Sequence, residues 1–217
     1  MTLFSEIRFL VIKELKLEWR QKYAFSGVLL YLISTVFIIY ISFFDVKPEV
    51  WNTLFWIIIL FTAVNAIAKS FLQESAGRVL YYYFIVSPQA VLLSKMIYNT
   101  ALMLLLSVLG LIIYSILVGN PVALPWYFLF TVLSGSISFS LIFTMISAIA
   151  SKAGNNFTLM AILSFPIIIP ILLLLMKLSL SSIIGNPFPL KDFFLLALMD
   201  VIVVMTAYIL FPYLWRD

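Results

Sequence analysis

Long apolar runs constrain this chain more than any other feature of its sequence. Six segments of roughly twenty residues carry almost no charge, and each is long enough to cross about 30 Å of hydrocarbon as a helix. They lie approximately at residues 24–44, 51–68, 96–118, 126–150, 157–176 and 193–215. Because the runs are continuous and do not alternate with polar residues, they favour helices over barrel strands. The sequence therefore predicts an all-α membrane protein with six transmembrane helices, forming a single domain over residues 1–217.

The composition agrees with a chain whose solvent is the lipid bilayer. Hydrophobic residues make up 65% of the chain and charged residues 10%, against about 25% charged residues in an ordinary soluble domain. The chain has no His and no Cys, which removes Ser-His and Cys-His catalysis, the usual zinc sites and the His or Cys ligands of haem. We therefore expect no enzyme, no directly bound cofactor and no metal site.

Basic residues are divided unequally between the two sides of the predicted bundle. Ten Lys and Arg residues fall on the side of the termini and three on the other. The excess should face the cytoplasm, so both termini are predicted to lie inside. The same rule explains the net charge of +4 without nucleic-acid binding.

Residues 3–22 precede the first apolar run and have a helical period. Phe4, Ile7, Val11 and Leu15 share one face, and a second face carries Glu6, Lys13, Lys16 and Arg20. This pattern predicts an amphipathic helix in the headgroup plane, with its basic side chains toward anionic lipid. A plain extension whose charges only set the topology is the alternative.

The longest polar interruption spans residues 69–95. The stretch from Gln73 to about Ile85 has no Pro and one Gly, which predicts a short cytoplasmic helix within reach of a soluble partner. Ser87-Pro88 should end it, because the residue before proline is driven out of the α region, and the chain should re-enter the membrane at Lys95. An inert hairpin with an interfacial belt of tyrosines fits the same residues equally well. The polar residues at its centre are Gln73, Glu74, Ser75, Gly77 and Arg78.

The fifth run contains Pro166 and Pro170. Each proline removes a backbone donor and crowds the preceding turn, so the helix should bend there. The sequence leaves two alternatives for this bend: a hinge that moves during transport, or a static kink that serves packing.

Asp200 is the only carboxylate well inside a predicted span. A buried acid is costly in a membrane and is therefore a functional candidate. Asn65 and Asn99 are candidate partners for it, and a plain helix-packing hydrogen bond is the alternative reading. Lys69, Lys95 and Lys177 lie near predicted span ends, where their ammonium groups can snorkel toward water, so we assign them no functional role.

Three stretches of the chain resemble one known family. They are the interruption FLQESAGRVLYYYFIVSPQAVLLSKMIYN, the run ISAIASKAGNNFTLMAILSFPIIIPILLL with its two prolines, and the basic lead-in EIRFLVIKELKLEWRQK. Together with six spans and an interfacial first helix, they resemble the ABC-2-type permease architecture and, within it, the CcmB family, or haem exporter protein B. The chain departs from the family pattern at Arg78 and Tyr81, where more acidic or polar residues are expected.

The resemblance implies a multi-pass permease subunit of the bacterial inner membrane that serves cytochrome c maturation. A separate ABC ATPase subunit would supply ATP hydrolysis, and residues Gln73–Arg78 would be the coupling helix that contacts it. Further maturation subunits would share the complex and handle haem, and two copies of the chain are expected. The chain has no G-x-x-x-x-G-K-[ST] motif, in keeping with an ATPase site elsewhere. The alternatives are an ABC-2-type permease for a lipid-linked glycan or a drug, and a non-transporting membrane scaffold.

Overall fold

The computed structural model describes residues 3–20, 23–43, 45–67, 69–72, 86–152 and 157–216. These ranges contain helices and no strands. Six of the helices are long and apolar enough to cross a membrane, which confirms the all-α class and the six predicted spans. They are α2 (Tyr23–Ser42), α3 (Pro48–Ile67), α6 (Pro88–Val118), α7 (Pro125–Lys152), α8 (Phe157–Ile184) and α9 (Leu190–Arg216).

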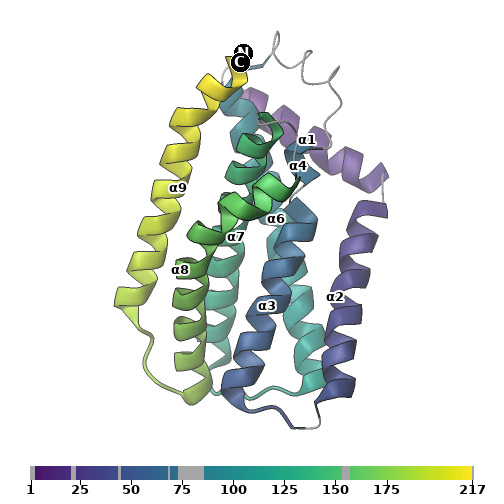
Figure 1. Ribbon diagram of the computed structural model, residues 1–217, viewed down its shortest axis with the longest axis vertical. Coiled ribbons are helices and arrows are strands. Elements are labelled where there is room, and N and C mark those ends of the chain that lie inside the picture. The colour runs from purple at the N-terminus through teal and green to yellow at the C-terminus, as the bar shows by residue number, and fades with distance from the viewer. Residues whose placement is uncertain are drawn as a thin grey trace.

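Two further helices lie at one end of the bundle. The six long helices run side by side along the long axis of the molecule, while α1 (Leu3–Arg20) crosses their end (Figure 1). The short α4 (Lys69–Leu72) lies at that same end. The start of α1 and the end of α9 also lie at that end (Figure 1), so one end of the bundle collects the segments that the sequence places in the cytoplasm.

Helix α7 forms the centre of the bundle. In its most apolar stretch 67% of the residues are buried, against 17% in α2 and in α9. Small side chains allow its neighbours to approach closely: a Cβ added to Gly135 would lie only 2.6 Å from the Trp56 ring of α3. The outer helices leave large apolar side chains such as Phe37 and Met205 exposed, as lipid contact requires.

Helix α6 begins earlier than predicted. We expected a turn at Ser87-Pro88 and a membrane entry at Lys95, but the helix starts at Pro88 and continues through Lys95. Proline suits the first helical position, because its missing N–H would have no partner there and its φ angle already fits. Ser87 precedes it with φ −67° and ψ 140°, the extended conformation that a residue before proline prefers.

Helix α8 contains both predicted kink residues, Pro166 and Pro170. Its first part lies obliquely across the bundle and the remainder runs along it (Figure 1). The helix also extends past Met176, where the predicted span ends, to Ile184. Ser179 and Ser182 of this extension are both buried: the Ser182 hydroxyl donates a hydrogen bond to the Ser179 carbonyl of the preceding turn, and the Ser179 hydroxyl bonds to Asn52 of α3.

The faces of α1 differ from the predicted ones. Leu10 is buried against the bundle, whereas Phe4 is 77% exposed and Leu15 52% exposed. Glu6, which we placed on the outer polar face, bonds to Ser87, the N-cap residue of α6, and Glu14 lies 3.7 Å from Lys95 of α6. The apolar residues left on the outside are free to meet lipid.

Candidate functional site

The predicted coupling residues Gln73, Glu74, Ser75, Gly77 and Arg78 lie outside the described residues. The two ends from which their segment departs are described, however. Ser70 and Phe71 of α4 stand just before it, and Ser87 stands just after it. These three residues, together with Lys95 and Asn99 of α6, are called the base cluster below.

Lys95 is the centre of the base cluster. Its side chain does not snorkel, although its predicted position allows it: the residue is only 3% exposed. The Nζ atom donates a hydrogen bond to the Ser70 carbonyl oxygen and lies 3.7 Å from Glu14 Oε1. It also sits 4.8 Å from the centre of the Phe71 ring. A buried ammonium group is tolerable only with such partners, so these contacts explain why the side chain turns inward.

Asn99 and Ser147 fasten α4 to the rest of the bundle. Asn99 Nδ2 donates to Ser70 Oγ at 3.1 Å and to Thr144 Oγ1 of α7 at 2.8 Å. The backbone N–H of Phe71 donates to Ser147 Oγ at 3.3 Å. The Phe71 ring packs against Phe211 of α9, with centroids 5.6 Å apart. A four-residue helix is thereby held by α6, α7 and α9 at once.

The other end of the segment is held by α1. The N–H and the hydroxyl of Ser87 both donate to Glu6 Oε2, at 3.1 and 2.7 Å. The hydroxyl bond and then the backbone bond lower the pKa of Glu6, because both stabilise its ionised form. Ser87 is the N-cap residue of α6 but makes no side-chain capping bond there. Its hydroxyl serves the contact with α1 instead.

The base cluster and α1 form one connected unit around segment 73–85. Glu6 accepts a hydrogen bond from Ser87, which lies after the segment. Glu14 lies beside Lys95, whose ammonium group bonds to α4, the helix before the segment. The described contacts therefore join α1, α4, α6 and α7 at the two places where the chain enters and leaves this segment. Rigid elements joined by buried polar contacts are the physical means by which a force at one surface reaches distant helices.

Asp200 contacts neither of its candidate partners. Ser138 Oγ of α7 donates to Asp200 Oδ2 at 2.8 Å, while Asn65 donates to the Phe61 carbonyl of its own helix and Asn99 belongs to the base cluster. The second carboxylate oxygen, Oδ1, is buried and has no partner within the described residues. The observed bond joins α7 to α9, which is the helix-packing arrangement that we held as the alternative.

A second polar network lies at the opposite end of the bundle, and the sequence did not point to it. Ser179 Oγ donates to Asn52 Oδ1 at 2.7 Å and accepts a bond from Trp56 Nε1 at 2.8 Å. Asn52 Nδ2 donates to the Met176 carbonyl at 2.9 Å. These bonds fix the second half of α8 to α3. A usable signal was the pair Asn52 and Trp56, four residues apart and thus on one helical face.

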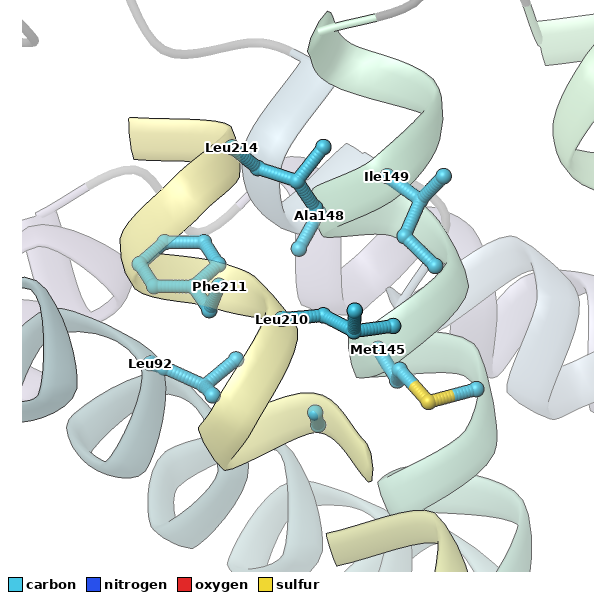
Figure 2. Close-up of a pocket in the computed structure, with 8 residues that line it drawn as sticks. Leu92, Met145, Ala148, Ile149, Leu210, Phe211 and Leu214 are labelled. Carbon is cyan, nitrogen blue, oxygen red and sulfur yellow. The ribbon is translucent and has the colours of Figure 1, made fainter. Parts of the chain in front are cut away.

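The bundle contains a small apolar recess between α7, α9 and α6 (Figure 2). Its cavity volume is about 10 Å³, room for about one water molecule and far below the roughly 300–1,000 Å³ typical of small-molecule sites. Within the described residues no group of His, Cys, Asp and Glu could hold a metal ion. The recess is lined by Leu92, Met145, Ala148, Ile149, Ala207, Leu210, Phe211 and Leu214.

The base cluster was largely missed by sequence reasoning, although one signal was present. Reading Ser87-Pro88 as a helix start would have placed Lys95 two turns inside α6, where an ammonium group needs a partner. Neither Ser70 nor Glu14 could have been named as the partner of Lys95 from sequence, because both come from other helices.

Comparison with known proteins gives one clear match. The model of a family described as CcmB protein matches residues 5–212, which include the larger part of α1, the base cluster and most of α9. No curated protein matches the chain.

Proposed function

The chain belongs to the CcmB family, and from this membership we propose that it is the permease subunit of an ABC transporter complex for cytochrome c maturation. The family consists of haem-exporter membrane subunits of that process, which work with an ATPase and other maturation subunits. The match over residues 5–212 is the observation that supports the proposal most strongly, because it covers all six long helices rather than a single motif.

In this proposal, ATP hydrolysis by the separate subunit acts on the chain through residues Gln73–Arg78. The base cluster supports this role, since both ends of the segment are tied to α1 and to the bundle by buried or partly buried bonds. A segment anchored in this way passes a push from the ATPase to α1, α6 and α7. The chain itself acts as a transporter subunit and has no ATPase site.

The proposed orientation puts the base cluster in the cytoplasm. The start of α1, α4 and the end of α9 lie at one end of the bundle (Figure 1), and the basic residues gather on that side in the sequence. The positive-inside rule then places both termini on the cytoplasmic side of a bacterial inner membrane.

Haem ligation belongs to another subunit in this account. The chain contains no His or Cys, which are the usual axial ligands of haem, and the recess, with a cavity volume of about 10 Å³, is too small for a ligand of that size. The chain would supply conformational work, while haem is handled elsewhere in the complex. Two copies per complex would present two coupling segments to a pair of ATPase subunits.

Two other functions remain as competitors to be tested. A permease for a lipid-linked glycan or a drug would use the same fold and coupling segment with a different cargo. A membrane scaffold without transport would need the spans for assembly and would not need residues 73–78.

Co-purification with the ATPase encoded beside this chain tests the proposal. The tagged wild type should retain the ATPase, and a Glu74→Ala, Gly77→Pro variant of normal thermal stability should lose it. Glu49→Ala at the opposite end of the bundle is the matched control and should retain it. Full retention by the double variant would remove segment 73–78 as the contact, and a wild type that binds no ATPase would favour the scaffold.

A further inference from the structure

Helix α3 is tied to its neighbours at the end of the bundle opposite the base cluster. Asn52 and Trp56 both bond to Ser179 of α8, and Trp51 Nε1 donates to the carbonyl of Gly119, directly after α6, at 2.9 Å. The three α3 side chains are no more than 2% exposed. Hydrogen bonds are directional, and a buried partner left without one is costly. These bonds therefore oppose any sliding or rotation of α3 at this end.

Aromatic rings fill the space between these bonds. The Trp51 ring packs against Tyr114 of α6 and Phe128 of α7, with centroids 4.8 and 5.6 Å apart. Phe55 contacts the same two rings at 5.8 and 5.6 Å. Close-packed buried rings cannot turn without displacing one another. The far-end block is the name used below for seven buried residues: Trp51, Asn52, Phe55, Trp56, Tyr114, Phe128 and Ser179.

The second part of α8, residues 171–184, is fixed to the far-end block. Besides the bonds of Ser179, the Ser182 carbonyl accepts a hydrogen bond from the N–H of Leu124, just before α7, at 3.0 Å. Leu175 has no exposed surface, and its Cδ1 atom would lie 3.0 Å from a Cβ added to Gly135 of α7. This part of α8 is thus joined to α3 and α7 by bonds and by close packing together.

The first part of α8 is packed differently. Its buried residues Met160, Ser164 and Ile168 follow one another at four-residue steps and so form a single row along the helix. Ile162 and Phe165, off this row, are 67% and 64% exposed. The contacts of Met160 and Ile168 are apolar and hence non-directional. A single narrow row of this kind tolerates a change of helix angle better than the buried hydrogen bonds of the second part do.

Pro166 and Pro170 lie where the two parts of α8 meet. A proline has no N–H, so the carbonyls of Ile162 and Pro166 lose the donors that an unbroken helix would supply. The direction of the helix changes as well, since the first part lies obliquely across the bundle and the remainder runs along it (Figure 1). The backbone is therefore weakest between a fixed part and a loosely packed one.

We propose that Pro166 and Pro170 form a hinge, about which the first part of α8 moves while the far-end block stays fixed. The movement is confined to the half of the bundle that contains the base cluster, and the opposite end stays closed. The inference does not depend on coupling to an ATPase, since it rests on packing within this chain.

Pulsed electron resonance on the full chain in lipid nanodiscs measures both parts of α8 against α3. The chain has no native Cys, so two introduced cysteines carry the only spin labels. Asn65→Cys with Ile162→Cys reports on the first part, and Val50→Cys with Ile184→Cys reports on the second; all four positions are exposed. The second pair should give one narrow distance distribution and the first pair a broader or divided one. Equal widths in the wild type would overturn the hinge.

Substitutions on either side of the hinge assign the movement to it. Pro166→Ala combined with Pro170→Ala restores both backbone donors, so the distribution of the first pair should narrow to the width of the second. Pro212→Ala is the matched control, because this proline lies inside α9, and it should leave both distributions unchanged. A first pair that stays broad without Pro166 and Pro170 would show that its movement has another origin and would overturn the proposal.

The fixed part is tested in the same way. Asn52→Ala combined with Ser179→Ala removes the bonds between α3 and α8, and the distribution of the second pair should then broaden while that of the first pair stays broad. A second pair that remains narrow would show that these bonds do not hold α8 in place, and the far-end block would lose its role.

Discussion

Lys95 of α6 holds the backbone carbonyl of Ser70 in α4, across a stretch of chain that includes the whole of segment 73–85. The ammonium group is buried, and it lies near Glu14 of α1 as well. One side chain therefore connects the helix before the segment, the helix after it and the helix that crosses the end of the bundle. If the base cluster supports the segment mechanically, as proposed, removing this contact is a direct test.

Lys95→Met keeps the length and apolar stem of the side chain but removes its charge. The Ser70 carbonyl then loses its donor and Glu14 loses a nearby cation, so the free energy of unfolding should fall by about 2 kcal/mol. Cytochrome c maturation should fall further than ATPase co-purification does, because the segment is still present but is held less firmly. Thermal unfolding in detergent and a maturation assay measure the two effects. Lys191→Met is the control, and a maturation level equal to that of the control would contradict the supporting role.

The bond between Glu6 and Ser87 should make stability depend on acidity. The pKa of Glu6 is lowered from its ordinary value of 4.5, so the stabilisation is complete above that value and is lost as the pH falls through the folded pKa. Wild type should therefore be more stable than Glu6→Gln at neutral pH, and the difference should shrink under acid conditions below about 4.5. Thermal unfolding across pH measures this difference. A gap that widens with acidity would show that Glu6 is not the group responsible.

Ser138→Ala should weaken the contact between α7 and α9. Asp200 Oδ2 loses its only observed donor, and a buried carboxylate without a partner is costly. We expect a loss of about 1–2 kcal/mol, largely recovered when Asp200→Ala is added, because the orphaned acid is then gone. Thermal unfolding of the single and double variants forms the cycle. Strictly additive losses would mean that the two side chains do not interact.

Gly135→Ala should be the most damaging glycine substitution in the bundle. The new Cβ would lie 2.6 Å from Trp56 Cη2 and 3.0 Å from Leu175 Cδ1. Trp56 cannot move aside freely, since its Nε1 is bonded to Ser179. Overpacking of this kind costs about 1–3 kcal/mol. Gly27→Ala is the matched control, because nothing lies within 4 Å of its Cβ position. Equal melting temperatures for the two variants would show that α7 and α3 are packed less tightly.

The length of the apolar runs predicted the spans well, because a helix must be long and apolar to cross a bilayer. The six helices follow from continuous apolar runs, and Pro166 and Pro170 lie inside α8 as expected. Helix ends were predicted less well. α8 continues to Ile184, and the buried Ser179 and Ser182 in this extension bond to Asn52 of α3 and to the preceding turn, whereas a hydropathy pattern records them only as polar.

The contact partners of charged and polar side chains could not be predicted from the sequence. Lys95 looked like a snorkelling residue and Glu6 like a solvent-facing one, yet both point into the structure. Asp200 pairs with Ser138 rather than with an asparagine. In each case the partner belongs to a different helix, and only the three-dimensional packing brings the two together.

Site-specific cross-linking is the most direct test of the claim that residues 73–78 contact the ATPase. The chain has no native cysteines, so only the introduced cysteine of this chain is labelled. A single Ser75→Cys, labelled with a photoactivated cross-linker in the assembled complex, should capture the ATPase subunit. Asn120→Cys at the opposite end of the bundle should not. Capture from Ser75 alone would establish residues 73–78 as the contact through which ATP hydrolysis drives this chain. Absence of capture at Ser75, or equal capture from Asn120, would contradict that account.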